Sequence, residues 1–130
     1  MLESLINATL ERLKEMDTFT QLEPYEGQLD DTDQFMIVPP ACFVEFSSAR
    51  PDGVLGTSSH VEIEMYLVTN HIKGHLNIPM LNIVDQIKDL FNDKKLGGLG
   101  RCHYTGFVRM GILPGFISYR VSFLFKEDQK

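Results

Sequence analysis

The chain has 130 residues, 43% of them hydrophobic and 23% charged, and its formal net charge is −6. This length predicts one domain, residues 1–130, that buries about two thirds of the surface of the unfolded chain. The negative charge and the lack of a basic stripe argue against a direct nucleic-acid partner, because proteins that bind nucleic acid neutralise its phosphates with Lys and Arg. No apolar run reaches the roughly 18 residues of a membrane-spanning helix, and the first residues lack the basic region of a secretory signal. We therefore expect a protein of a reducing cytoplasm that makes no membrane contact.

Two segments carry apolar residues at the three- and four-residue spacing of an amphipathic helix. The first lies at the N-terminus, and its stripe consists of Leu2, Leu5, Ile6, Thr9, Leu10 and Leu13. The second begins near Pro79, a residue that suits the first turn of a helix. Its stripe consists of Met80, Ile83, Val84, Ile87, Leu90 and Phe91. Gly97-Gly98 is expected to end this second helix.

Residues 17–40, which follow the first helix, show few signs of regular structure. Phe19–Leu22 is a candidate for a short edge strand, and Pro24 and an acidic run that starts at Asp30 break any longer element. Loops of this length are usually functional or mobile. The apolar group Phe35–Val38 is expected either to pack under this loop or to face a partner.

Four segments alternate between apolar and polar residues, which predicts half-buried β-strands. Their core-facing residues are Cys42, Val44 and Phe46; Val61, Ile63, Met65 and Leu67; Cys102, Tyr104, Val108 and Met110; and Ile117, Tyr119, Val121, Phe123 and Phe125. Turns at Arg50–Gly53 and Gly111–Gly115 join them in two pairs. The order helix, hairpin, helix, hairpin predicts an α+β fold, a two-layer sandwich whose antiparallel sheet of about four strands carries both helices on one face.

No residue pattern indicates catalysis, a metal or a cofactor. His71 and His75 have the spacing of two zinc ligands on a helix, but Gly74 lies between them and no third ligand is near. The acidic run Asp30–Asp33 lacks the central glycine and the closing glutamate of a calcium loop. The chain also has neither a nucleophile elbow nor a phosphate-binding loop. We therefore expect a protein that is not an enzyme and that needs no metal or cofactor.

The cysteines, Cys42 and Cys102, both fall on predicted core faces of strands. A chain without a secretory signal favours buried thiols, although a disulfide between the two stays open. A thiol on a core face is inert, so neither cysteine is expected to act as a nucleophile.

The outer face of the predicted sheet mixes both signs of charge with aromatic residues, a composition more typical of a contact surface than of a free one. An ordinary exposed sheet face is the alternative. The acidic loop and the first hairpin tip flank the same strands, and loops held by a rigid sheet often carry binding residues. The candidate protein-interface residues are Asp30, Asp31, Phe35, Met36, Glu45, Arg50, Asp52, Glu62, Glu64, Tyr66, Arg109 and Arg120.

The N-terminal amphipathic helix is followed by Gly27-Gln28-Leu29-Asp30, Pro40-Ala41 before Val44-x-Phe46, Ala49-Arg50, Leu96-Gly-Gly-Leu-Gly100 and a last strand that ends Phe123-Leu-Phe125. This order resembles a family of small tail proteins of Mu-like bacteriophages and prophages. The resemblance implies a tail terminator or completion protein that forms a ring, typically a hexamer, caps the tail tube and helps to join it to the head. Its partners would be further copies of itself, the tube and the head–tail connector. Its location would be the virion tail, after assembly in the cytoplasm of the host bacterium.

A second hypothesis stays open, a stand-alone α+β ligand-binding or regulatory domain without enzymatic activity. A ring-forming protein should present a large self-interface and no deep pocket. A binding module should present an apolar pocket with a few convergent polar groups.

Overall fold

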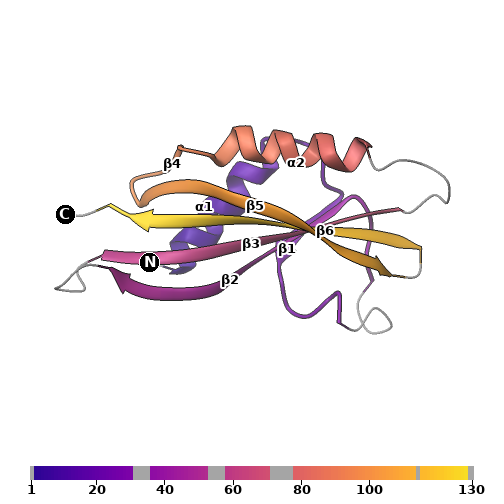
Figure 1. Ribbon diagram of the computed structural model, residues 1–130, viewed down its shortest axis with the longest axis horizontal. Helices are drawn as coiled ribbons and strands as arrows, with labels where there is room; N and C mark the ends of the chain where they lie inside the picture. Colours follow the sequence, from indigo (N-terminus) through magenta and orange to yellow (C-terminus); the bar gives the residue numbers. More distant parts are fainter. Residues whose placement is uncertain (1, 31–35, 53–57, 71–77, 114, 129–130) are drawn as a thin grey trace.

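In the computed structural model of the protein, residues 2–30, 36–52, 58–70, 78–113 and 115–128 are described (Figure 1). In chain order the elements are α1 (Leu2–Lys14), β1 (Gln21–Pro24), β2 (Ala41–Asp52), β3 (Ser58–Asn70), α2 (Ile78–Phe91), β4 (Lys95–Leu96), β5 (Gly100–Leu113) and β6 (Phe116–Glu127).

The strands of the described residues form one six-stranded sheet in the order β1-β2-β3-β6-β5-β4. The β2–β3, β3–β6, β5–β6 and β4–β5 pairs are antiparallel, whereas β1 runs parallel to β2. The α+β class and the two hairpins, β2–β3 and β5–β6, are confirmed. The expected antiparallel sheet of about four strands is wrong, because the sheet is mixed and gains a short strand at each edge.

The parallel pairing of β1 and β2 follows from the chain between them. Parallel neighbours need a crossover of roughly a dozen residues or more, whereas antiparallel neighbours can be joined by a tight turn. Residues 25–40 supply this crossover, and Leu22 of β1 lies opposite Cys42 of β2 as a result. The candidate strand at Phe19–Leu22 is therefore present, shifted toward Pro24 by about two residues.

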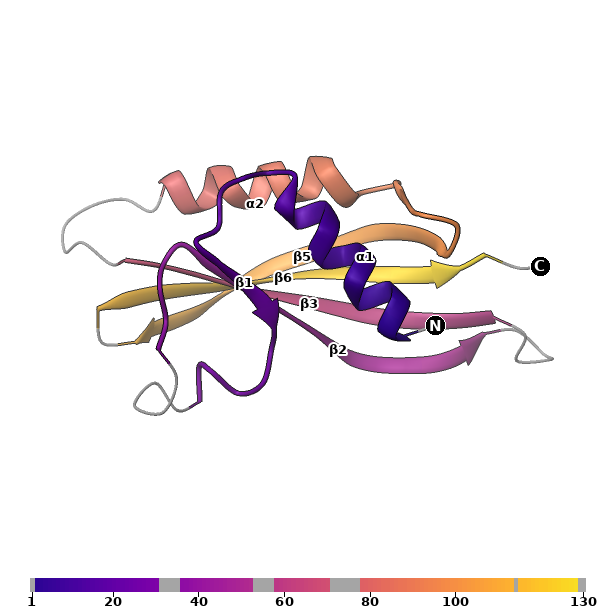
Figure 2. The same ribbon diagram turned by 180° about the vertical axis from the view of Figure 1, so that it is seen from behind.

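Both helices pack on the same face of the sheet, as expected (Figure 2). The main core joins Leu5 and Leu13 of α1 and Val84 and Ile87 of α2 to the apolar side chains of the strands. The predicted core faces of β3 and β6 are confirmed. Their fully or almost fully buried residues include Val61, Ile63, Met65, Leu67, Ile117, Val121, Phe123 and Phe125.

The second helix ends earlier than its glycine signal predicts. It stops at Phe91, and Asp93 then takes a positive φ of 58°. Gly97, with a φ of 58°, turns the chain between β4 and β5 instead, where the Leu99 amide donates to the Leu96 carbonyl at 3.1 Å. The glycine pair therefore serves a strand turn and not the end of the helix.

A second, smaller core covers one end of the outer face of the sheet. Ala41, Phe43, Tyr66 and Val68 are buried there beneath Tyr25, Leu29, Ile37 and Phe116. The Gln28 side chain, 2% exposed, holds the crossover in place by accepting from the Glu26 amide and donating to the Pro24 carbonyl. The expectation that Phe43 and Tyr66 face outward in the open is therefore wrong.

Strand β5 reverses the faces of its residues halfway along. Its register against β6 shifts between Tyr104 and Gly106, and Gly106 has a φ of 139°. A bulge of one residue moves the following side chains to the opposite face, here as far as a second register shift between Arg109 and Gly111. Phe107 and Arg109 therefore share the helix-bearing face, and Val108 moves to the outer face with Arg120. The predicted core positions of Val108 and Met110 are wrong, since 50% and 45% of their surfaces are exposed.

The first hairpin is longer than predicted. Arg50, Pro51 and Asp52 continue β2 and pair with His60, Ser59 and Ser58 of β3, so these residues do not form a turn. The strand tolerates Pro51 because β1 pairs only with residues up to Val44, which leaves this end of β2 at the sheet edge. Gly53 lies outside the described residues.

Candidate functional site

A cluster of polar side chains centres on Glu64, on the part of the outer face that the crossover leaves open. The Glu64 side chain is 13% exposed, and Ser122 Oγ donates to its Oε2 atom. Ser47 Oγ lies 3.2 Å from Glu64 Oε1 and 3.3 Å from Glu62 Oε2. Arg120 Nε is 3.6 Å from Glu64 Oε2. Hydroxyls and a guanidinium thus compensate the charge of this half-buried carboxylate.

Glu45 adds another carboxylate directly across from Glu64 in the β2–β3 pair. Like charges at opposed positions destabilise a sheet unless other groups relieve them. The Tyr66 hydroxyl bonds to the Glu45 side chain, and burial together with this bond and the nearby carboxylates raises the pKa of Tyr66. Tyr66 therefore stays a neutral hydrogen-bond donor at physiological pH, and it ties the polar cluster to the second core.

A shallow depression of about 310 Å³ opens beside this cluster. Its lining consists of Arg50, Glu62, Glu64, Thr105, Ser122, Phe123 and Leu124. The structure thus brings together three of the predicted interface residues, Arg50, Glu62 and Glu64, from two neighbouring strands. Charged and hydroxyl side chains line part of this depression, and they can contact a basic or amide group of another protein.

The other predicted interface residues are spread over the molecule. Arg109 lies on the opposite face of the sheet, Met36 is 81% exposed beside β1, and Asp30 accepts a hydrogen bond from Tyr25 in the crossover. Asp52 pairs in β2 with Ser58. Asp31 and Phe35 lie outside the described residues. The predicted interface residues that the structure describes therefore do not form one continuous patch.

The described residues contain no group of three His, Cys, Asp or Glu side chains placed to hold a metal ion. His103 Nδ1 lies 3.0 Å from Asp93 Oδ1 in an exposed pair. His71 and His75 fall outside the described residues. Within the described part of the chain, no helix has the length and apolar character needed to cross a membrane.

Cys42 and Cys102 are both free and fully buried, which confirms the expectation of buried thiols. Burial raises the pKa of Cys102 to about 12 and raises the pKa of Cys42 as well. Because only the thiolate reacts, we expect neither cysteine to be alkylated by iodoacetamide in the native protein at pH 8. Both should be alkylated in denaturant, as mass spectrometry of the intact chain would show. Rapid alkylation of either residue without denaturant would contradict this burial.

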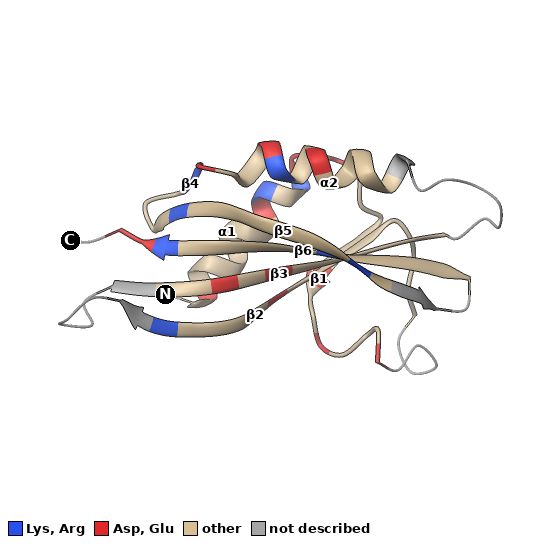
Figure 3. Ribbon diagram, viewed as in Figure 1, with Lys and Arg blue, Asp and Glu red and all other residues tan. Residues whose placement is uncertain are grey.

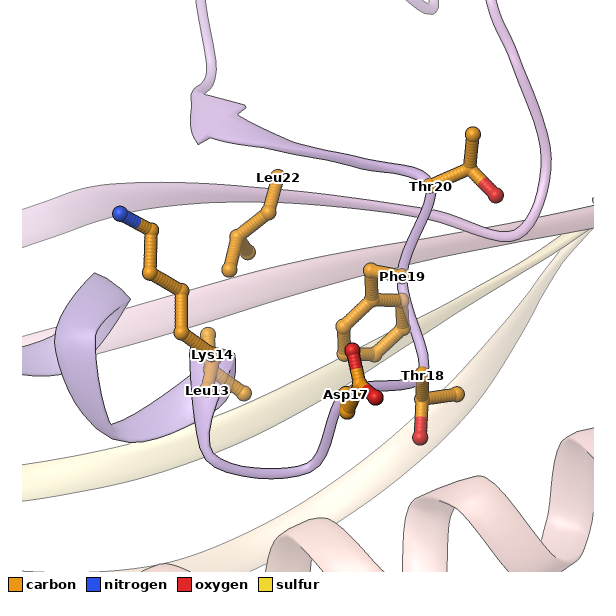
Figure 4. Close-up of a pocket in the computed structure, with 7 residues that line it drawn as sticks. All are labelled: Leu13, Lys14, Asp17, Thr18, Phe19, Thr20 and Leu22. Atoms are coloured by element: carbon orange, nitrogen blue, oxygen red, sulfur yellow. The ribbon is translucent and has the colours of Figure 1, made fainter.

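The two edges of the sheet carry features that the alternation of residues does not reveal. Beside β1, a hollow of about 260 Å³ is lined by Leu13, Lys14, Asp17, Thr18, Phe19, Thr20 and Leu22 (Figure 4). At the other edge, β5 exposes three large apolar side chains, Phe107, Val108 and Met110, by 44%, 50% and 45%. The bulge in β5 places Val108 on the outer face, and Gly106 is a local signal for this bulge in the sequence.

The charges of the strands also divide between the two halves of the sheet. Strands β1, β2 and β3 contain five Asp or Glu and one Arg, whereas β4, β5 and β6 contain five Lys or Arg and one Glu. The strand order places these two groups of strands in opposite halves of the sheet (Figure 3). The strands of one half are thus mainly acidic and those of the other half mainly basic.

No model of a known protein family matches the chain, and no curated protein sequence matches it either.

Proposed function

We propose that this protein is a structural subunit that assembles head to tail into a ring, which caps the tail tube of a phage or prophage and helps to join it to the head. The observation that carries the assembly is the opposite charge of the strands in the two halves of the sheet. The tail location rests on the resemblance of its segments to small tail proteins of Mu-like phages. Neither part requires catalysis, a metal or a cofactor.

The charge division favours one mode of association over another. When one copy places its basic edge against the acidic edge of the next, opposite charges meet, and this contact leaves a free edge of each sign at the ends. Repetition of such a heterologous contact closes a ring if the rotation fits. A two-fold dimer through either edge would instead bring like charges together. Charge therefore supports a ring of copies more than an isolated dimer.

The net charge of −6 limits how stable such a ring is in free solution. Copies repel each other overall, so we expect the free protein to be a monomer or a weak oligomer and the ring to form stably on the tube. The polar cluster around Glu64 and the depression beside it would then meet the tube or the connector.

Disruption of the gene in its phage or prophage tests this function. Lysates should contain tail tubes of abnormal length and tails without heads, as seen by negative-stain electron microscopy, and a plasmid copy of the gene should restore normal tails. A copy with Arg50→Ala and Asp52→Ala should retain the melting temperature of the wild type within about 2 °C, because the Arg50 side chain is exposed and no core is lost. The same copy should restore fewer joined particles.

Normal tails at wild-type yield after disruption of the gene would contradict the proposed function. That result would favour the ligand-binding or regulatory domain.

A further inference from the structure

We propose that, in the ring on which the proposed function rests, Phe107 of one copy inserts into the hollow beside β1 of the next copy, with Arg109 placed against Asp17. The partner at the β5 edge is thus a second copy of this chain in the same orientation. The contact joins an apolar anchor to a pair of opposite charges.

The β5 edge has the features of a surface that is covered in an assembly. Strand β4 pairs only with Gly100 and Arg101, and the later part of β5 has no strand neighbour on its outer side among the described residues. Free edge strands usually carry charges that prevent further pairing. Here Phe107 is exposed on the helix-bearing face and Val108 on the outer face instead, so this edge carries apolar surface where charges would be usual.

The hollow beside β1 has a suitable size for an aromatic ring. Leu13, Phe19 and Leu22 give the apolar part of its lining, and Lys14, Asp17, Thr18 and Thr20 give the larger polar part (Figure 4). Its volume of about 260 Å³ exceeds the roughly 150 Å³ of an apolar cavity known to hold benzene. Because β1 is only four residues long and ends at Pro24, it offers little backbone for a new strand. Insertion of a side chain is therefore the better use of this edge.

The register of the sheet places Arg109 level with Leu22, which lines the hollow, and Phe107 one row further along, level with Pro24. One cross-strand row runs Leu22, Cys42, Leu67, Tyr119, Arg109, from the β1 edge to the β5 edge. The next row along runs Pro24, Val44, Met65, Val121, Phe107. Directly opposed residues share a face, and both rows lie on the face that carries the helices. Two copies set edge to edge therefore bring Arg109 opposite Leu22, and the Phe107 side chain has to reach back by one row, about 7 Å of strand, to enter the hollow.

Charge selects the orientation of the second copy. Arg109 belongs to the basic half of the sheet, and Asp17 is exposed at the rim of the hollow next to the acidic half. If two copies were instead paired by a two-fold axis through their β5 edges, Arg109 of one copy would lie against Arg109 of the other. Aromatic residues and arginines are also the types that most often dominate the binding energy of an interface.

Cross-linking of the full-length protein through introduced thiols tests the contact. The native thiols do not interfere, because both are buried. The variants Arg109→Cys and Asp17→Cys are mixed at the highest concentration that stays in solution and treated with a short bis-maleimide. The mixture should give mixed dimers, each variant alone should give few dimers, and a chain with both changes should give a ladder of dimer, trimer and larger species. The control chain carries Asp85→Cys on α2 in place of Arg109→Cys and should give no ladder.

Phe107→Ala, introduced into the chain that carries both thiols, should reduce the yield of the ladder by roughly tenfold, as expected for loss of an anchor residue. Failure of the two thiols to cross-link, or a majority of dimers from Arg109→Cys alone, would overturn the contact. If electron microscopy shows rings but the two thiols give no ladder of cross-linked species, the contact is overturned and the proposed function stands. A ladder from a protein whose gene is dispensable for tails would uphold the contact and contradict the proposed function.

Discussion

Replacing Ile63 by alanine should lower the free energy of unfolding by about 2–5 kcal/mol, the usual cost of truncating a buried isoleucine. Ile63 is fully buried in the centre of β3, between Phe46 of β2 and Phe123 of β6. Both helices pack over this face, so the neighbours have little room to move into the cavity. Urea denaturation followed by circular dichroism measures the change, read as a shift in midpoint at constant slope.

Two controls make the Ile63 result specific to burial. Ile63→Val removes one methylene and should cost only about 0.5–1.5 kcal/mol. Val108→Ala changes a side chain that is 50% exposed and should cost less than about 1 kcal/mol. A loss below about 0.5 kcal/mol for Ile63→Ala would mean that β3 lies in another register, with this side chain outside the core.

Gly100→Ala should destabilise the protein by about 1–3 kcal/mol or more, the cost of inserting atoms where there is no space. A Cβ atom at Gly100 would lie 2.1 Å from the Lys126 carbonyl oxygen and 2.6 Å from Cζ of Phe125. The first of these is a backbone atom, so β5 and β6 would have to separate at the point where Gly100 pairs with Glu127. The loss should appear as a fall of several degrees in the melting temperature.

Gly98→Ala is the matched control for Gly100. No atom lies within 4 Å of a Cβ built at Gly98, and its φ is not in the left-handed region. This substitution should change the free energy of unfolding by less than about 1 kcal/mol. Alanine has less conformational freedom than glycine in the unfolded chain, which favours a stabilising change. Equal losses for the two variants would contradict the close approach of β6 to Gly100.

The periodicity of the chain was sufficient to predict both helices and both hairpins. Leu5 and Leu13 on one helix and Val61, Ile63 and Met65 on a strand repeat at spacings that only one regular structure can bury on a single face. The last strand followed the same rule and is confirmed in the core. These predictions succeeded because each depends on residues within one segment.

The second core was missed although the sequence holds a signal for it. Ala41–Val44 and Met65–Val68 are continuous apolar runs, a pattern typical of strands that are buried on both faces. The alternation from Val61 to Leu67 predicts burial of one face only. Tyr25, Leu29 and Ile37 of the crossover and Phe116 of β6 cover the other face, and no local pattern predicts where a crossover packs.

The sequence by itself thus determined the elements, the helix-bearing core and the charges along the chain. The tertiary structure alone decided the parallel placement of β1, the burial of Tyr66, the exposure of Phe107 and the separation of acidic and basic strands to opposite edges. Periodicity depends on neighbours a few residues apart, and it therefore follows from the sequence. A bulge, a crossover or a strand order depends on contacts between distant segments, whose free energies are summed only when the whole chain packs.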